Sequence, residues 1–145
     1  RDMGRLEDAV VEFDRVRKQN PNYVPARLHL GLTLYALDKK DEAAREWQEV
    51  LKIDPENRSA RAYLRRALAA DSANAMVQYC AALTYWQLAE KEQAVRSLDQ
   101  AVRGGYPPIA WLRDSPVFRE WDHQTGFRAI VARASAQPPH TTSPN

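Results

Sequence analysis

The sequence has very little of what cross-links or loosens a chain. It has one cysteine, Cys80, which excludes an internal disulfide framework and suits a reducing compartment. It has only 5 glycines, most of them near the ends of expected elements, and this scarcity favours helices. No apolar run approaches the roughly 18 residues that a membrane-spanning helix needs. We therefore expect a helical chain with no membrane span, in the cytoplasm, with the periplasm as the alternative.

The sequence also lacks a strong charge of one sign. Its 145 residues carry a net charge of +2, so electrostatics make no case for nucleic acid or an anionic membrane as a partner. Hydrophobic residues make up 44% and charged residues 28%, which is typical of a soluble domain with a continuous core. Because the chain opens on Arg1 and not on methionine, we expect it to be a piece of a longer protein.

What the sequence does contain is helical periodicity, clearest in residues 24–57. Ala43, Trp47 and Val50 are spaced three and four apart, so they line one face of a helix. Pro55 cannot continue that helix. A glycine inside a helix costs about 1 kcal/mol relative to alanine, so Gly31 in the preceding helix needs a reason. The reason we expect is a close approach between the two helices of a pair.

The same pattern recurs along the chain. Ala9, Phe13, Val16 and Pro21 lie 34 residues before Ala43, Trp47, Val50 and Pro55. Ala94, Leu98 and Ala101 lie 51 residues after Ala43, Trp47 and Val50. The second offset is one and a half times the first. A single helix at residues 58–70 is therefore expected to stand between two helix pairs.

Residues 24–57 resemble the tetratricopeptide repeat. The resemblance rests on Leu30, Gly31 and Leu34 in the first helix, on the alanine and aromatic of the second, and on the closing proline. The aromatic that the family places early in the first helix is replaced by Arg27 here and by Gln78 in the later repeat. The resemblance implies stacked helix pairs that form a binding surface and not a reaction centre.

The predicted fold is all-α, a short solenoid of antiparallel helix pairs with an irregular helical C-terminal cap. The array occupies residues 1–108, divided into a half repeat 1–23, a repeat 24–57, a junction helix 58–74 and a repeat 75–108. The cap is expected at 109–136 and a disordered tail at 137–145. The expected helices are 5–19, 24–37, 41–53, 58–70, 75–89 and 91–103, with short helices from Ser115 and from about Gln124. The C-terminal quarter loosely resembles endings of bacterial tetratricopeptide proteins, so a bacterial scaffold or regulatory protein is expected.

In this family the first helices of successive repeats line the concave surface, and the matching positions here form an apolar, aromatic-rich set. The candidate groove residues are Leu28, His29, Leu32, Tyr35, Tyr63, Arg66, Met76, Tyr79, Cys80, Leu83 and Trp86. Such a groove suits a helical or extended apolar segment of a protein partner. Two alternatives stay open. In the first, these residues are not available to a partner, because they are plain core or are covered by the C-terminal segment. In the second, the chain is an architectural segment that dimerises through Leu6, Val10 and Phe13.

Chaperone-binding members of the family hold a peptide's terminal carboxylate with a lysine and asparagine clamp. The matching positions here are Leu28, His29 and Leu32 in one repeat and Met76, Tyr79, Cys80 and Leu83 in the other. Because basic and amide groups are absent from them, the clamp is not expected to operate.

No enzymatic activity, cofactor or metal site is expected. His29, His123 and His140 are scattered, and none is spaced from a cysteine or carboxylate as metal ligands are. Asp122 and His123 are adjacent, but neighbouring residues on a helix do not face one another. Cys80 lies on an apolar helix without an obvious base.

The junction helix has a basic side made of Arg58, Arg61, Arg65 and Arg66. Two interpretations remain open: a docking patch for an acidic partner, or an ordinary solvated face. Nucleic acid is disfavoured as the partner, because no aromatic stacking platform accompanies the arginines.

Overall fold

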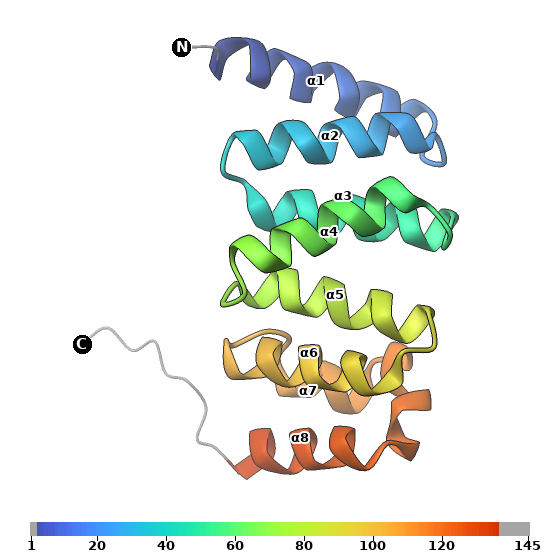
Figure 1. Cartoon of the computed structure of the whole chain (residues 1–145), viewed down its shortest axis with the longest axis vertical. Coiled ribbons are helices and arrows are strands. Elements are labelled where there is room, and N and C mark those ends of the chain that lie inside the picture. The colour runs from blue at the N-terminus through green and yellow to red at the C-terminus, as the bar shows by residue number, and fades with distance from the viewer. Residues whose placement is uncertain (1–2, 137–145) are drawn as a thin grey trace, which may run out of the picture.

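The computed structural model describes residues 3–136, and within that range it consists of helices and the turns between them, without strands. The helices follow one another in a single column, each roughly antiparallel to the one before (Figure 1). The elements are α1 (Met3–Gln19), α2 (Val24–Ala36), α3 (Lys40–Ile53), α4 (Arg58–Ala70), α5 (Ala75–Gln87), α6 (Lys91–Arg103), α7 (Ile109–Asp114), η1 (Pro116–Phe118), η2 (Glu120–His123) and α8 (Thr125–Ala136). The all-α solenoid expected from the sequence is confirmed. The tail expected at 137–145 lies outside the described residues.

The helices end close to where the sequence pattern places them, and the differences have local causes. α2 and α5 end at Ala36 and Gln87, slightly before the expected 37 and 89. Soon after each end, Asp38 and Ala89 take left-handed backbone angles, with φ of 65° and 64°, which close the helix as a C-terminal cap does. The sequence did not predict α7, because six residues after two prolines are too few to show a helical period.

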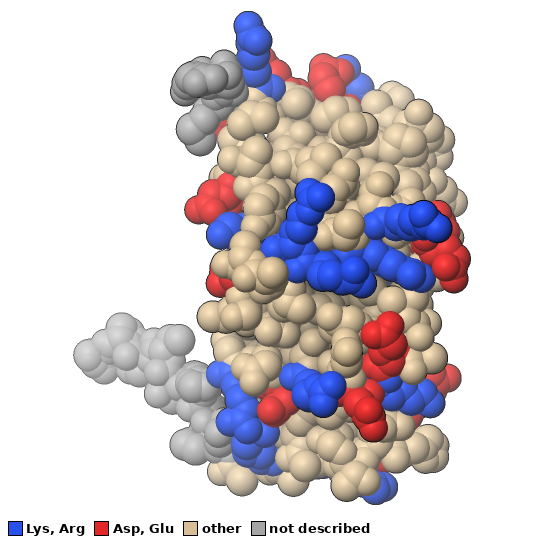
Figure 2. Space-filling model, viewed as in Figure 1, with Lys and Arg blue, Asp and Glu red and all other residues tan. Residues whose placement is uncertain are grey.

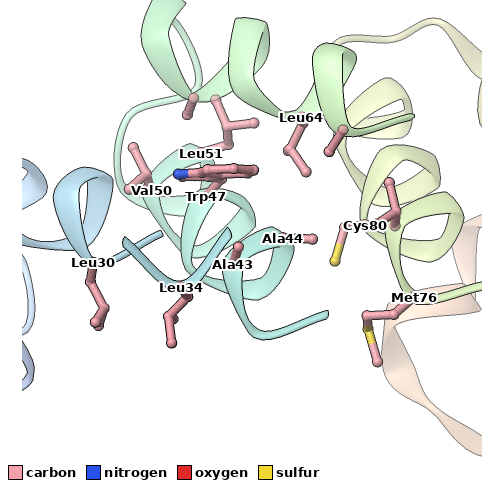
Figure 3. Packing of buried hydrophobic residues seen from close by; sticks show 13 residues of the cluster. Leu30, Leu34, Ala43, Ala44, Trp47, Val50, Leu51, Leu64, Met76 and Cys80 are labelled. Carbon is pink, nitrogen blue, oxygen red and sulfur yellow. The ribbon is translucent and has the colours of Figure 1, made fainter. Parts of the chain in front are cut away.

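α2 with α3, and α5 with α6, form the two closely packed helix pairs. Gly31 is the reason α2 and α3 can approach so closely, since a methyl group there would lie 2.2 Å from the indole nitrogen of Trp47. The indole Nε1 instead donates to the backbone oxygen of Leu28 at 3.4 Å. Trp47 is 2% exposed and lies at the centre of the first core, close to Val50 and Leu51 (Figure 3).

α4 is entered and left by turns of the same kind. The N-terminal caps are Asn57 and Asn74, whose side chains accept hydrogen bonds from the backbone nitrogens of Ala60 (2.9 Å) and Val77 (3.0 Å). The fourth residue of α2, α4 and α5 also reaches back to the preceding turn. These bonds run from Arg27 Nε to the Pro21 oxygen (2.8 Å), from Arg61 Nη2 to the Pro55 oxygen (2.9 Å) and from Gln78 Nε2 to the Ser72 oxygen (2.8 Å). α4 thus begins as the first helix of a repeat does. Because α5 begins in the same way, α4 is not followed by a second helix of its own.

Because α4 has no second helix of its own, α3 and α5 contact each other directly and α4 packs against both. In Figure 1, α4 passes in front of α3 at this level of the column. α5 therefore has two covered sides with different neighbours. Residues of its first two turns, such as Val77 and Cys80, belong to the first core, and Ala82 belongs to the second.

The second core joins the helix pair α5–α6 to the C-terminal elements. Its largest fully buried side chains are Trp121, Phe118 and Phe127. Phe118 lies against Trp121 with ring centroids 5.2 Å apart and against Phe127 at 5.8 Å. These short elements therefore owe their positions to aromatic packing against α5 and α8 and not to helical propensity.

Candidate functional site

A hollow of about 550 Å³ lies between α3, α5 and the C-terminal elements. Its volume falls in the range of roughly 300–1,000 Å³ that is usual for ligand sites in proteins. Its lining residues are Arg45, Gln48, Glu49 and Lys52 of α3, Met76, Tyr79, Cys80, Leu83, Trp86 and Gln87 of α5, and Tyr106, Trp111, Val117 and Trp121 of the C-terminal segment. We call this space the α5 hollow.

The floor of the α5 hollow is one face of α5. Met76, Tyr79, Leu83 and Trp86 follow each other at intervals of three and four residues, so they project to one side of the helix. At the end of this row Gln87 Nε2 donates to the backbone oxygen of Leu51 in α3, which fixes the distance between floor and wall. The floor is thus tied to α3 at one end and is predominantly apolar.

The C-terminal wall is aromatic. The ring of Tyr79 lies 5.1 Å from that of Tyr106 in an edge-on arrangement and 6.4 Å from that of Trp111. Trp111 is 46% exposed and Val117 is 51% exposed. Exposed aromatic side chains such as Trp111 are enriched where proteins bind partners.

The far end of the α5 hollow is closed by stacked indoles. Trp86 lies on Trp121 with ring centroids 4.2 Å apart and an interplanar angle of 13°. The ammonium group of Lys91 lies 5.3 Å from the centre of the Trp86 ring, within range of a cation–π contact. Trp121 is fully buried and Trp86 half-buried, so Trp86 belongs both to the second core and to the wall.

The α3 wall is polar and carries both signs of charge. Arg45 is exposed, and Lys52 forms an ion pair of 3.0 Å with Glu49. The hollow therefore has an apolar floor, an aromatic wall and a charged wall. This arrangement fits a segment with one apolar face and one polar edge, such as an amphipathic helix.

The structure brings five of the candidate groove residues together. Met76, Tyr79, Cys80, Leu83 and Trp86 all line the α5 hollow. Whether they bind a partner remains a prediction.

The remaining candidate groove residues lie elsewhere, on α2 and α4. Leu28 and Tyr35 pack against the first core, Leu32 is 38% exposed on α2, and His29 is exposed on the same helix with its ring stacked on Phe13 at 5.5 Å. On α4, Tyr63 packs on Trp47 at 5.3 Å, and Arg66 is exposed. None of these residues lines the hollow, because α5 packs directly on α3, so α3 and not α2 or α4 provides the facing wall.

Sequence reasoning missed the α3 wall and the aromatic wall. The α3 residues Arg45, Gln48 and Glu49 carry no apolar signal, and α3 is the second helix of its pair, whereas first helices were expected to line the concave surface. Trp111 and Val117 were visible as large apolar residues in an aperiodic segment. Nothing local in the sequence shows that this segment borders the hollow and leaves it open.

The chemistry of the lining favours binding. Burial raises the pKa of Cys80 to about 12 and that of Tyr79 to about 12, so both groups are neutral at physiological pH. Among residues 3–136, no group of three or more histidine, cysteine or acidic residues is placed to hold a metal ion. Asp122 and His123 are exposed and lie outside the hollow.

The described helices include none that could cross a bilayer, judged by length and apolar character together.

Comparison with known proteins gives one match to a family model and one similar solved structure. The family model described as "Tetratricopeptide repeat" matches residues 1–62. No curated protein matches the chain in sequence. A solved structure described as "Crystal structure of MamA" is similar at 19% identity and a TM-score of 0.41, covering 90% of this chain and 85% of that chain. Residues 1–62 of the chain are thus similar in sequence to the tetratricopeptide repeat.

Proposed function

We propose that the chain is a protein-interaction module that binds an amphipathic, apolar-faced segment of a partner protein in the α5 hollow. Tetratricopeptide repeats mediate interactions between proteins through the surfaces that their stacked helices create. The observation that carries the proposal is an aromatic-lined hollow of about 550 Å³ with two exposed apolar side chains at its mouth. One turn of helix bearing two or three apolar side chains would match its chemistry.

The energetics favour binding by Trp111 and Val117. Both side chains are about half exposed, so a partner that covers them removes further apolar area from water. Each square ångström of apolar area contributes about 25 cal/mol. Trp111 is held in place by the rings of Tyr79 and Tyr106, so little conformational freedom is lost on binding.

The test is titration with a fluorescein-labelled amphipathic peptide of about 16 residues, with leucine at helical spacing on one face and glutamine on the other. Trp111→Ala and Val117→Asp are expected to weaken binding roughly tenfold or more. Val11→Asp is the matched control. Val11 is an apolar residue 58% exposed on α1, far from the hollow in sequence and in the column of helices (Figure 1).

Equal weakening by the control, or unchanged binding after both hollow substitutions, would show that the peptide binds elsewhere. Leu32→Asp adds a second discrimination, because Leu32 is exposed on α2 outside the hollow. Loss of binding in Leu32→Asp would extend the binding surface to α2. Sedimentation at several concentrations checks the architectural alternative, which requires self-association through Leu6, Val10 and Phe13 that Val10→Asp weakens.

A further inference from the structure

The surface of α4 carries a concentration of positive charge that the α5 hollow does not use. The helix has arginine at positions 58, 61, 65 and 66 and contains no acidic residue. Figure 2 shows these basic groups as a band across the middle of the molecule, over α4. Elsewhere on the described surface, opposite charges commonly lie side by side, as in the pair of Arg103 with Asp99 at 3.1 Å.

Intramolecular ion pairs leave most of this charge unneutralised. Of the four arginines on α4, only Arg61 forms an ion pair with a residue in the range 3–136. Its partner is Glu56 at 3.4 Å, and the side chain of Glu56 is 86% exposed. Such a solvent-exposed ion pair contributes little to the stability of the fold. Arg58 and Arg65 are exposed and make no ion pair with a described residue. Their charge is therefore available to a partner.

The arginines are also arranged in register. Arg58, Arg61 and Arg65 are spaced by three and four residues, so they form one stripe along α4, whereas Arg66 is turned about 100° away from Arg65. The stripe runs beside a narrow cleft of about 20 Å³ between α4 and α5 that Arg61 and Arg65 help to line. The cleft has room for about one small group.

The walls of this cleft are mainly apolar, and they include the half-buried Leu68, Tyr85 and Leu88. α5 contributes Ala81, Thr84 and Tyr85 to the cleft, and their helical spacing places them on the side opposite to Tyr79 and Leu83 in the floor of the α5 hollow. The two surfaces are therefore on opposite sides of α5, and one partner segment cannot occupy both.

We propose that this surface, the α4 stripe of Arg58, Arg61 and Arg65 with its adjoining cleft, docks an acidic helical segment of a protein. The partner's carboxylates, spaced by three and four residues, pair with the guanidinium groups, and one small apolar side chain enters the cleft. Arginine presents a planar fork of donors that matches a carboxylate in a bidentate manner.

Other acidic partners fit the surface less well. Single-stranded nucleic acid needs exposed aromatic faces for stacking, and Tyr85, the aromatic residue of the cleft, is half-buried. A membrane surface favours apolar side chains that project into the lipid. The large exposed apolar residues of the described chain, among them Trp111 and Val117, do not lie on α4.

The experiment uses a fluorescein-labelled helical peptide of about 16 residues with glutamate at intervals of three and four and a valine between them. The full chain is expected to bind it, and Arg58→Glu with Arg65→Glu should weaken binding roughly tenfold or more, with a steep dependence on salt. Arg61 is left unchanged because it also closes the turn before α4. Circular dichroism checks that the variant folds.

Two control variants test whether the stripe, and not positive charge in general, binds the peptide. Arg66→Glu removes charge from the same helix but from outside the stripe, and Arg128→Glu does so at an exposed position on α8. Both are expected to change affinity less than threefold. A third variant, Arg58→Lys with Arg65→Lys, keeps the charge and loses the fork, and should weaken binding severalfold.

Absence of peptide binding, or equal weakening by the stripe and control variants, would overturn the proposal. So would tighter binding of an oligothymidylate or of phosphatidylserine vesicles than of the acidic peptide. Failure here is distinct from failure of the α5 hollow, because the uncharged peptide used there should bind equally well to the Arg58→Glu, Arg65→Glu variant.

Discussion

At the scale of single residues, Gly31 determines how closely α2 and α3 pack. A methyl group on it would lie 2.2 Å from Trp47 Nε1, so Gly31→Ala forces the indole or the helix to move. We expect a loss of about 1–3 kcal/mol in the free energy of unfolding, measured by urea denaturation. The control is Gly4→Ala in α1, where nothing lies within 4 Å and alanine should be neutral or slightly stabilising. Equal effects at the two positions would contradict the close approach.

Replacing Trp47 and replacing Trp86 should have different effects on stability and on peptide binding. Trp47 is 2% exposed within the first core, so Trp47→Ala is expected to cost about 3–5 kcal/mol of stability. Trp86 is half-buried at the wall of the α5 hollow, so Trp86→Ala should cost less and should weaken binding of the amphipathic peptide. Unfolding curves and peptide titrations of both variants check this. The reverse pattern would show that core and groove have been assigned wrongly.

Cys80 should be chemically inert in the folded protein. It is 2% exposed, and burial raises the pKa of its thiol from 9.0 to about 12. Alkylation by iodoacetamide at pH 8 is therefore expected to be at least about a hundredfold slower in the native than in the denatured chain. Because the unfolded thiol ionises first, this group's contribution to stability is present below pH 9 and is lost as pH rises towards 12. Rapid native labelling would mean that local opening of the first core exposes Cys80 to solvent.

At the scale of elements, α4 and α5 depend on their asparagine caps. Each side chain satisfies a backbone N–H that the helix itself leaves unpaired, at Ala60 for Asn57 and at Val77 for Asn74. Asn57→Ala and Asn74→Ala should each cost about 1 kcal/mol, measured by thermal or urea unfolding. The control is Tyr23→Ala at the N-terminus of α2, where the structure has no side-chain cap bond.

Most of the element pattern could be predicted from the sequence because it depends on nearby residues. Repeats of Ala43 and Trp47 at offsets of 34 and 51 residues placed the helix pairs and left α4 between them. The pattern could not place α7, since residues 109–123 are held by packing in the second core and against Tyr79 and Tyr106, and not by a helical period. Leu112, Phe118 and Trp121 are buried there by contacts with helices that lie earlier and later in the chain.

At the scale of the whole molecule, the two cores share α5. Met76 and Cys80 belong to the first core, Ala82 belongs to the second, and Tyr79 packs against both. Because loss of either core uncovers α5, we expect a single cooperative unfolding transition, although stacked arrays can lose cooperativity.

Trp121→Ala tests this coupling. It removes a fully buried side chain from the second core and should destabilise the first core as well. Hydrogen exchange of α3 amides should become faster in this variant, in step with exchange in α8. Unchanged protection in α3, or two separate transitions in urea, would show that the cores unfold independently.

The sequence by itself determined that this chain is a row of α-helices, where the pairs lie and which large residues form their seams. Those features follow from spacings of three and four residues and from small residues such as Gly31, which are local properties. Only the tertiary structure decided that α3 and the C-terminal segment, and not α2 and α4, enclose the α5 hollow. The reason is that an open surface remains wherever neighbours fail to cover a helix, and for α5 those neighbours, Lys52 and Trp111 among them, are distant in sequence.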